Sequence, residues 1–396
     1  MSGDPIALSL TYTDKQPDIA EVVIVGGGIM GMATAWNLAN RGVSGVVVVE
    51  QSELGSGSSA KPLGGVRANF SDPANILLGK RSLEAYENFE RDFGTDIQFS
   101  KVGYLFVARN DDELENLKVC RQAQLDQYVE CHLISAKEAA TLNPLLDPTH
   151  ITGAIFSPND GHVKPSKVIE GYARSCSALG VSILDHTQVL DISLEDGRVS
   201  SVSTNRGTIR TKNVICAAGA WSQKIGNLVG ENLPVTAVRR LIGVTPEKPG
   251  GYPTIPFTID LSSTMYFHNY GSGLLLGVSH AEEPSFCREF CYEWVKEFSE
   301  TAEVIAPSLA NPELAGGWGG FYENTPDHNA MIGKSDKVAG FYYITGFSGH
   351  GLLQAPAAAE LLSDVYLGKQ SFMNSDMWSA SRFSDSTQLV QEVNII

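Results

Sequence analysis

Two glycine-rich stretches, far apart in the chain, have the residue types that bring backbone N–H groups close to a ligand. The first, VVIVGGGIMGMATAWNLANRG, contains Gly26, Gly28 and Gly31 in a G-x-G-x-x-G pattern. The second, TGFSGHGLLQAP, places His350 among glycines directly before an alanine-rich run. A glycine loop that opens a helix offers free N–H groups and the positive end of the helix dipole. Both stretches therefore predict loops that bind anionic or electron-rich groups.

The first loop is flanked by the elements that a dinucleotide site requires. The β-branched run Val22–Val25 predicts a buried strand before it, and GVVVVE predicts a second strand after the helix. In such a unit Gly26 permits the tight turn, Gly28 admits a pyrophosphate, and Gly31 lets helix and strand pack closely. Glu50, 22 residues after Gly28, can accept hydrogen bonds from a ribose 2′-hydroxyl and disfavours a 2′-phosphate. We therefore expect an adenine dinucleotide, either FAD or NAD.

Length and composition are those of a folded protein of about two domains. The chain has 396 residues, 43% of them hydrophobic, and its net charge of -16 argues against nucleic acid or anionic membranes as partners. No apolar run reaches the length of a membrane span, and the N-terminus lacks the basic region of a signal peptide. The six cysteines form no CxxC pair and no metal-ligand set, although Cys287 and Cys291 are spaced to share a helix face. We expect buried thiols, no metal and a cytoplasmic protein.

The element pattern suggests that the nucleotide-binding domain is discontinuous, because strand–glycine–helix signals recur late in the chain. We assign residues 19–93, 160–234 and 321–385 to it, residues 94–159 and 235–320 to a substrate domain, and residues 1–18 and 386–396 to tails. Helices are expected over residues 75–93, 111–128, 165–179 and 352–367, near 287–299, and after the N-cap Ser135.

The motifs together resemble the D-amino-acid oxidase superfamily of flavoenzymes, in particular its sarcosine oxidase, dimethylglycine dehydrogenase and proline dehydrogenase branch. They are GGGIMG with Glu50, VICAAGAWS, TPDHNAMIG and YYITGFSGHG, and the resemblance runs from about Glu21 to Gly368. It implies FAD rather than NAD. It also implies an α/β plus antiparallel β fold, with a doubly wound, Rossmann-like FAD domain and a substrate domain built on a mixed or antiparallel sheet covered by helices.

The resemblance also implies which residues bind FAD. They are Gly26, Gly28, Ile29, Met30, Gly31, Glu50, Gln51, Ser58, Ser59, Gly65, Val189, Ala218, Gly219, Trp221, Gly346, Phe347, Ser348, Gly349, His350, Gly351 and Leu352. The second glycine loop would then place a helix N-terminus against the flavin edge that gains negative charge on reduction.

Four residues are candidates for the substrate site. Arg67 matches the family's carboxylate-binding arginine, and a guanidinium can grip a carboxylate bidentately; the alternative is a surface arginine. His350 matches the family's histidine and could bind the flavin edge, position the substrate amine or act as a base; the alternative is a residue that caps the loop. Tyr266 and His268 have the spacing of one strand face and could line the pocket, or be ordinary half-buried strand residues. His280 is a weaker candidate of the same kind.

Three positions depart from the monomeric sarcosine oxidase pattern. Gly320 stands where the flavin-linking cysteine is found, which implies non-covalent FAD. Leu353 and Leu275 stand where that pattern has lysines that bind carboxylate and activate oxygen. A cation near the flavin stabilises superoxide, so their absence predicts a slow reaction with oxygen and favours a dehydrogenase or one subunit of a complex. Arg67 would remain the main positive anchor, unless the substrate carboxylate is absent or farther from the amine.

We therefore expect an FAD-dependent amine or amino-acid oxidoreductase, either an oxidase or a dehydrogenase. It would oxidise the C–N bond of a secondary or tertiary amine, such as sarcosine, dimethylglycine or proline, to an imine by hydride transfer to flavin N5. Two alternatives stay open. One is an FAD-dependent 2-hydroxy-acid dehydrogenase. The other is an FAD-bearing electron-transfer subunit of a hetero-oligomeric amine dehydrogenase, with a partner subunit or another electron acceptor.

Overall fold

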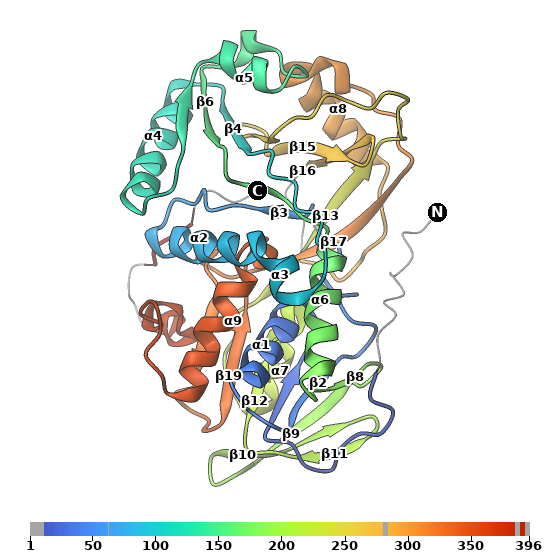
Figure 1. Ribbon diagram of the computed structural model, residues 1–396, viewed down its shortest axis with the longest axis vertical. Coiled ribbons are helices and arrows are strands. Elements are labelled where there is room, and N and C mark those ends of the chain that lie inside the picture. The colour runs from blue at the N-terminus through green and yellow to red at the C-terminus, as the bar shows by residue number, and fades with distance from the viewer. Residues whose placement is uncertain (1–11, 62, 280–283, 385–388, 393–396) are drawn as a thin grey trace.

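The computed structural model describes residues 12–61, 63–279, 284–384 and 389–392 and arranges them around two large sheets (Figure 1). The first sheet has six strands in the order β18-β19-β12-β1-β2-β8. These strands are β1 (Val22–Val25), β2 (Val46–Val49), β8 (Ser182–Leu184), β12 (Val214–Cys216), β18 (Met331–Lys334) and β19 (Phe341–Thr345). Neighbouring strands run parallel except β18 and β19, which pair antiparallel.

Both faces of the six-stranded sheet are covered, which explains its continuous β-branched runs. Alternate side chains such as Val22 and Ile24 enter a core with three helices, while Val23 and Val25 enter a core on the other face. The three helices are α1 (Ile29–Asn40), α6 (Pro165–Ala178) and α9 (Gly351–Leu367). The opposite face is covered by α7 (Ser222–Val229) and by a small sheet of β9 (Val189–Glu195), β10 (Arg198–Thr204) and β11 (Gly207–Arg210).

The second large sheet has eight strands in the order β17-β13-β16-β15-β14-β4-β6-β5 and lies in the upper half of Figure 1. These strands are β4 (Tyr104–Ala108), β5 (His132–Ile134), β6 (Gly153–Ser157), β13 (Thr236–Val244), β14 (Phe257–Asp260), β15 (Met265–Tyr270), β16 (Gly273–Val278) and β17 (Gly316–Asn324). Every neighbouring pair is antiparallel except β14 and β4.

The remaining elements connect and cover the two sheets. The helices are α2 (Pro73–Glu87), α3 (Phe89–Phe93), α4 (Asp111–Asp126), α5 (Ala136–Leu142) and α8 (Glu293–Ile305), with short 3-10 turns at Pro148–His150, Gly219–Trp221, Pro307–Leu309, Asp376–Trp378 and Ala380–Phe383. A two-stranded sheet pairs β3 (Gly65–Val66) with β7 (Gly161–His162). No helix in the described residues is long and apolar enough to cross a membrane.

The expected fold class is confirmed: a helix-covered, mainly parallel sheet is joined to a mainly antiparallel one. Ser135 caps α5 as expected, and it forms a capping box with Glu138. The assigned domain boundaries stay a prediction, as do the tails, whose outer parts lie beyond the described residues.

Two details of the expected helices are wrong. The helix expected over residues 75–93 is divided at Asn88 into α2 and α3. The helix expected near residues 287–299 begins only at Glu293, so Cys287 and Cys291 precede it and share no helix face. Cys287 is exposed and Cys291 half-buried, whereas the other four cysteines are buried as expected. Apolar spacing alone did not locate the start of this helix because Phe286 and Phe290 precede it at helical spacing.

Candidate active site

A large cavity lies where the two sheets meet. Its lining combines the two glycine-rich loops with side chains from the eight-stranded sheet, among them Tyr104 on β4, Tyr266 on β15 and Tyr322 on β17. The residues that form it come from nearly the whole length of the chain, from Val25 to Leu353. Such a cavity at the junction of two sheets, apolar with a few polar groups, is the usual form of a cofactor and substrate site.

The first glycine loop connects β1 to α1 as the dinucleotide pattern requires. Gly26 has a φ of +114°, and a Cβ there would overlap the carbonyl group of Ala217. A Cβ at Gly31 would overlap the carbonyl oxygen of Gly26, so this glycine permits the close contact of helix and loop. Gly28 faces the cavity, and the Oγ of Ser59 accepts a hydrogen bond of 2.9 Å from the N–H of Ile29 at the start of α1.

Glu50 lies at the end of β2 and is tied to the same loop. Its carboxylate accepts hydrogen bonds from the N–H groups of Gly27 at 2.8 Å and Ser52 at 2.9 Å. Burial raises the pKa of this carboxyl, although the backbone N–H groups of Gly27, Ser52 and Gln51 oppose the shift. The bare backbone, the helix N-terminus and the acid at the strand end all fit an adenine dinucleotide.

The second glycine loop connects β19 to α9 and lies against the same cavity. Gly349 has a φ of +95°, and a Cβ there would come within 2.5 Å of the Tyr322 ring. Ser348, Gly349 and Gly351 line the cavity, and His350 occupies the N-cap position of α9 without a side-chain capping bond. The N–H groups at the start of α9 therefore belong to the cavity wall.

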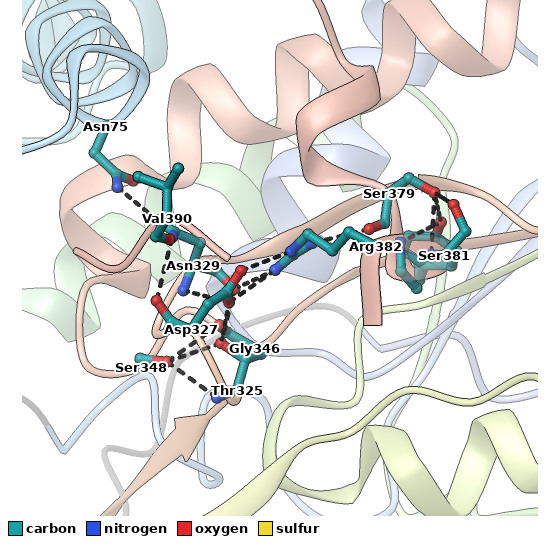
Figure 2. A network of polar contacts seen from close by, with 12 residues as sticks. Asn75, Thr325, Asp327, Asn329, Gly346, Ser348, Ser379, Ser381, Arg382 and Val390 are labelled. Atoms are coloured by element: carbon teal, nitrogen blue, oxygen red, sulfur yellow. Dashed lines mark hydrogen bonds and ion pairs between the residues drawn. The ribbon is translucent and has the colours of Figure 1, made fainter. Parts of the chain in front are cut away.

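A polar network supports this loop from behind (Figure 2). The Oγ of Ser348 accepts a hydrogen bond of 3.2 Å from the N–H of Thr325, and the hydroxyl of Thr325 donates to the carbonyl oxygen of Asn329 at 2.8 Å. Arg382 binds both carboxylate oxygens of Asp327, at 2.8 and 3.1 Å, and donates to the Asn329 carbonyl at 2.8 Å. The TPDHNAMIG motif thus holds the glycine loop in place from outside the cavity.

Removal of the Arg382 charge is expected to destabilise the fold. The Arg382→Met variant would leave the carboxylate of Asp327, whose side chain is 3% exposed, without its charged partner. Breaking a buried ion pair in this way costs about 3 kcal/mol. The measurement is denaturant unfolding, with Arg91→Met as control because Arg91 pairs with Asp92 on the surface and should change stability by less than about 1 kcal/mol. Equal effects of the two variants would contradict the structural role of this pair.

Arg67 is buried in the cavity wall beside two aromatic rings. It is 3% exposed, and its guanidinium lies 4.2 Å from the ring centre of Phe70 and 5.4 Å from that of Phe106. It also donates a hydrogen bond to the carbonyl oxygen of Asn69. Arg67 lines the cavity together with Tyr104 and His350, so the alternative of a surface arginine is excluded.

His350 is buried next to Arg67 and is neutral near pH 7. It is 3% exposed and meets the Phe70 ring edge-on at 5.5 Å between ring centres. Burial lowers its pKa well below the usual value, and the charge of Arg67 and the neighbouring His328 lower it further. Its Nε2 has no hydrogen-bond partner among the residues that the structure describes. The imidazole therefore has a nitrogen that a ligand in the cavity can engage.

Tyr266 and His268 lie on the same strand but in different surroundings. Tyr266 lines the cavity, and its ring covers Gly277, where a Cβ would overlap it. His268 does not line the cavity, contrary to expectation. It stacks on Phe257 at 4.7 Å between ring centres, its Nδ1 lies 2.7 Å from the carbonyl oxygen of Asn269, and burial lowers its pKa to about 3. Phe257, which lines the cavity itself, takes the place expected for the histidine. His280 lies outside the described residues.

Most residues expected to bind the cofactor line this one cavity. They are Gly26, Gly28, Ile29, Met30, Glu50, Gln51, Ser58, Ser59, Gly65, Val189, Ala218, Gly219, Trp221, Ser348, Gly349, His350, Gly351 and Leu352. Gly31, Gly346 and Phe347 do not. Gly31 contacts the first loop instead, Gly346 faces Thr325, and Phe347 is buried in the helix-side core.

Several charged residues of the cavity have no counterpart in the sequence-based expectation. Its lining includes four further cations and a second carboxylate, namely Lys61, Lys224, Arg240, Arg288 and Glu323. Burial raises the pKa of Glu323 to about 7, while the N–H of Gly346 and the hydroxyl of Thr345 oppose the shift.

Leu353 lines the cavity, but Leu275 is buried in the eight-stranded sheet. That Arg67 is the main anchor for a substrate carboxylate stays a prediction, although four further cations line the same cavity.

No sequence motif marks these additional residues. Arg240 stands in VRRLIGV, where strand alternation places it on the same face as Ile242, but alternation does not reveal which face meets a cavity. Tyr322 and Glu323 belong to the stretch FYENTPD and could have been selected by their position next to that motif.

Asp160 is a buried acid beside the Arg67 loop. Its Oδ1 accepts a hydrogen bond of 3.0 Å from the N–H of Ala68, and its Oδ2 has no partner among the described residues. Burial raises its pKa to about 7, against the opposing effects of the Ala68 N–H and the Arg67 charge. With this pKa Asp160 is mainly protonated at pH 6 and mainly ionised at pH 8.5.

This pKa predicts how a small carboxylate will bind. Below pH 7 the full charge of Arg67 acts on the ligand, whereas above pH 7 ionised Asp160 both offsets that charge and repels the ligand. We expect the affinity for acetate to fall about tenfold between pH 6 and 8.5. In Asp160→Asn the fall should be smaller, with the remainder due to Glu323, whose pKa is also raised to about 7, and the exposed-site control Glu300→Gln should behave as the wild type. A wild-type affinity that is constant over this range, measured by titration calorimetry, would contradict the assignment.

Comparison with known proteins agrees with the geometry of the site. The family model described as DAO, FAD dependent oxidoreductase, matches residues 21–365. The crystal structure of L-proline dehydrogenase from P. horikoshii superposes with a TM-score of 0.88 at 29% identity, over 93% of this chain and 99% of that one.

Two curated relatives extend the comparison. The 4-methylaminobutanoate oxidase (formaldehyde-forming) of Paenarthrobacter nicotinovorans is 26% identical over 94% of this chain and 47% of its own length. Sarcosine oxidase subunit beta of Rhodobacter capsulatus is 26% identical over 87% of this chain and 85% of its own length. The chain spans less than half the length of several of the curated relatives that it matches.

Proposed function

Since the chain belongs to the family of FAD-dependent oxidoreductases, we propose that it oxidises the C–N bond of a secondary or tertiary amine that carries a carboxylate. The observation that carries the proposal is the pairing of Arg67 with a neutral His350 in one cavity wall, next to the bare N-terminus of α9. An anion anchor and an uncharged nitrogen base side by side suit a substrate that has a carboxylate and an amine.

The cofactor fits the part of the cavity that the two glycine loops form. The start of α1, with Gly28 and Ser59, would hold the diphosphate, and Glu50 would hold the ribose. The N–H groups at the start of α9 would face the flavin edge that gains negative charge. When bound, FAD supplies the acceptor for the two electrons that leave the substrate. Gly320 offers no thiol at the position of the family's flavin-linking cysteine, so we propose that FAD is held without a covalent bond.

The substrate is held by Arg67 and the aromatic wall. The guanidinium can bind a carboxylate with two parallel hydrogen bonds, which fixes the α-carbon and the nitrogen relative to the cavity. The rings of Tyr104, Tyr266 and Tyr322 line the same space and can pack against N-alkyl groups. Because Arg67 is buried, a bound carboxylate would be largely removed from water, which strengthens the electrostatic contact.

His350 has a role that depends on its neutral state. A substrate ammonium must lose a proton before its nitrogen can release electrons, and a neutral imidazole can accept a hydrogen bond from that ammonium. Protonated His350 would instead repel it. Burial lowers the pKa of His350 and the positive charge of Arg67 lowers it further, so the position of Arg67 beside the imidazole favours the neutral form.

The similar proteins support an amine as substrate. The names L-proline dehydrogenase, 4-methylaminobutanoate oxidase and sarcosine oxidase subunit beta each refer to a compound with a secondary amine and a carboxylate, or to a subunit of an enzyme for one. In proline and sarcosine one carbon separates the amine from the carboxylate, whereas 4-methylaminobutanoate has two further carbons between them, so the length of the substrate is the variable to test.

The proposal is tested by turnover of a graded substrate series. The substrates are sarcosine, dimethylglycine, proline and 4-methylaminobutanoate, and turnover is followed with a dye that serves as artificial electron acceptor. The product is identified by mass spectrometry as an aldehyde or, for proline, as the cyclic imine. We expect turnover of at least one of them, and none of the corresponding 2-hydroxy acids. Turnover of hydroxy acids alone would replace the C–N assignment by the C–OH alternative.

A further inference from the structure

Two cations in the cavity wall lie close together although they come from different parts of the fold. Lys61 follows the loop after β2, and Arg288 precedes α8. Both line the cavity. Burial lowers the pKa of Lys61, and the charge of Arg288 lowers it further. Among the described residues neither cation has a carboxylate within ion-pair distance, although the charge of Glu50, another residue of the cavity wall, opposes the lowering of the Arg288 pKa by burial. Such a pair of like charges is costly unless an anion lies between or beside them.

Arg288 reaches the cavity because the edge strand β17 is rich in glycine. A Cβ at Gly319 would lie 2.8 Å from the carbonyl oxygen of Arg288, and a Cβ at Gly317 would overlap the ring of Phe290. These glycines let the segment around Arg288 lie directly against the strand. The N–H of Ser285 also donates to the carbonyl oxygen of Ala237 at 3.0 Å, which fixes the segment to the sheet.

The guanidinium of Arg288 reaches the loop after β2, which also lines the cavity. Its Nη1 donates a hydrogen bond of 3.0 Å to the carbonyl oxygen of Ser56, in the loop after β2. Its carbon atom Cζ lies 4.9 Å from the ring centre of Phe321 and 5.6 Å from that of Trp221. These contacts hold the guanidinium on the cavity wall and leave further N–H donors for a ligand.

Lys61 belongs to the loop after β2, which also contacts the first glycine loop. Its carbonyl oxygen accepts a hydrogen bond of 2.7 Å from Nε1 of Trp318, and its Cβ lies 3.2 Å from the Cβ position of Gly320. Ser59, two residues earlier, is bonded to the N–H of Ile29 at the start of α1. The two cations are thus attached to the wall that includes the N-terminus of α1.

We propose that Lys61 and Arg288 form a phosphate-binding clasp, in which a residue carried by the eight-stranded sheet closes over a phosphate group held on the side of the six-stranded sheet. A guanidinium beside an ammonium offers several charged N–H donors to the oxygens of a phosphate group. Two sources can supply the phosphate: the diphosphate of the FAD, or the phosphate of a separate ligand that binds next to it. The inference is independent of the substrate proposed above, since it concerns binding of a phosphate group and not oxidation of an amine.

The first part of the test measures flavin binding without turnover. Apoprotein of the wild type and of Lys61→Gln, Arg288→Gln and the double variant is titrated with FAD and with riboflavin, which lacks phosphate, by the quenching of flavin fluorescence. If the clasp holds the cofactor diphosphate, FAD should bind at least tenfold more weakly to the double variant while riboflavin binds equally. Arg288→Lys should recover part of the loss, and Lys296→Gln, on the exposed face of α8, should cause none.

The second part separates the two sources. FAD-loaded protein is titrated with FMN and with inorganic phosphate by calorimetry. Binding to the loaded wild type that is lost in the double variant, with unchanged FAD affinity, assigns the clasp to a separate phosphate ligand. Unchanged FAD affinity together with no difference in FMN or phosphate binding would overturn the proposal.

A further variant tests the path by which Arg288 enters the cavity. Gly319→Val should displace the Arg288 segment through its backbone carbonyl and reproduce the phenotype of Arg288→Gln. Gly316→Ala is the matched control, because a Cβ there meets nothing within 4 Å. A Gly319→Val protein that folds, as judged by circular dichroism, and binds phosphate groups like the wild type would contradict this route.

Discussion

Replacement of Arg67 by glutamine is expected to lower kcat/KM for the preferred carboxylated amine by about three orders of magnitude. The guanidinium is buried between rings, so a carboxylate that binds it is largely removed from water and the bond is correspondingly strong. Its loss also frees the substrate to rotate, which affects kcat as well as KM. The measurement is steady-state turnover together with the FAD content of the variant, which should equal that of the wild type.

Two comparisons distinguish loss of an anchor from general damage. Arg67→Lys keeps the positive charge but cannot bind a carboxylate bidentately, so it should recover only part of the activity that Arg67→Gln loses. A secondary amine without a carboxylate should be oxidised equally slowly by the wild type and by Arg67→Gln. If both variants lose this slow activity as well, Arg67 holds the architecture of the site and not the substrate.

A single added methyl group at Gly31 is expected to reduce FAD affinity about a hundredfold. Gly31 has ordinary helical geometry, so alanine would normally favour the helix. Here its Cβ would overlap the carbonyl oxygen of Gly26, a backbone atom that can move only if the loop between β1 and α1 opens. The measurement is fluorescence titration of Gly31→Ala apoprotein with FAD.

The control for this prediction again uses the open position on β17. Gly316→Ala adds the same methyl group where nothing lies within 4 Å, and FAD affinity should be unchanged. If Gly31→Ala bound FAD as tightly as the wild type, the loop would have to be able to shift. The role assigned to this glycine from the sequence would then be wrong.

Sequence patterns predicted the parts of the fold that depend on interactions between residues close together in the chain. The β-branched runs of β1 and β2 and the spacing of Gly26, Gly28 and Gly31 predicted the first βαβ unit. The N-cap at Ser135 was equally predictable from the sequence, because both hydrogen bonds of its capping box form within four residues. The second glycine loop was located for the same reason, and its relation to the first loop came from the family resemblance.

The rest of the site depends on contacts between distant segments. Arg288 meets Ser56 because glycines in β17 admit its backbone, and no pattern around Arg288 carries that information. His268 has the strand spacing that was expected, but its stacking partner Phe257 on the neighbouring strand lines the cavity and His268 does not, which no local pattern reveals. Arg240 is the same kind of case, since its position opposite Gly320 is a matter of register between β13 and β17.

The cations in the cavity also change the expectation for the electron acceptor. Slow reaction with oxygen was inferred from leucines at two positions of the family's lysines, yet Lys61 and Lys224 line the cavity from other positions. The rate at which air reoxidises the reduced protein is therefore a separate property to be measured. It does not follow from Leu275 or Leu353.

The most direct test of C–N bond oxidation is an anaerobic absorbance titration of the FAD-loaded protein with sarcosine, dimethylglycine, proline and 4-methylaminobutanoate. We expect at least one of them to bleach the visible flavin band, and Arg67→Gln to require a far higher concentration of the same compound. Admission of air then reports how readily oxygen serves as acceptor. Bleaching by 2-hydroxy acids, with none by any of the amines, would contradict the account.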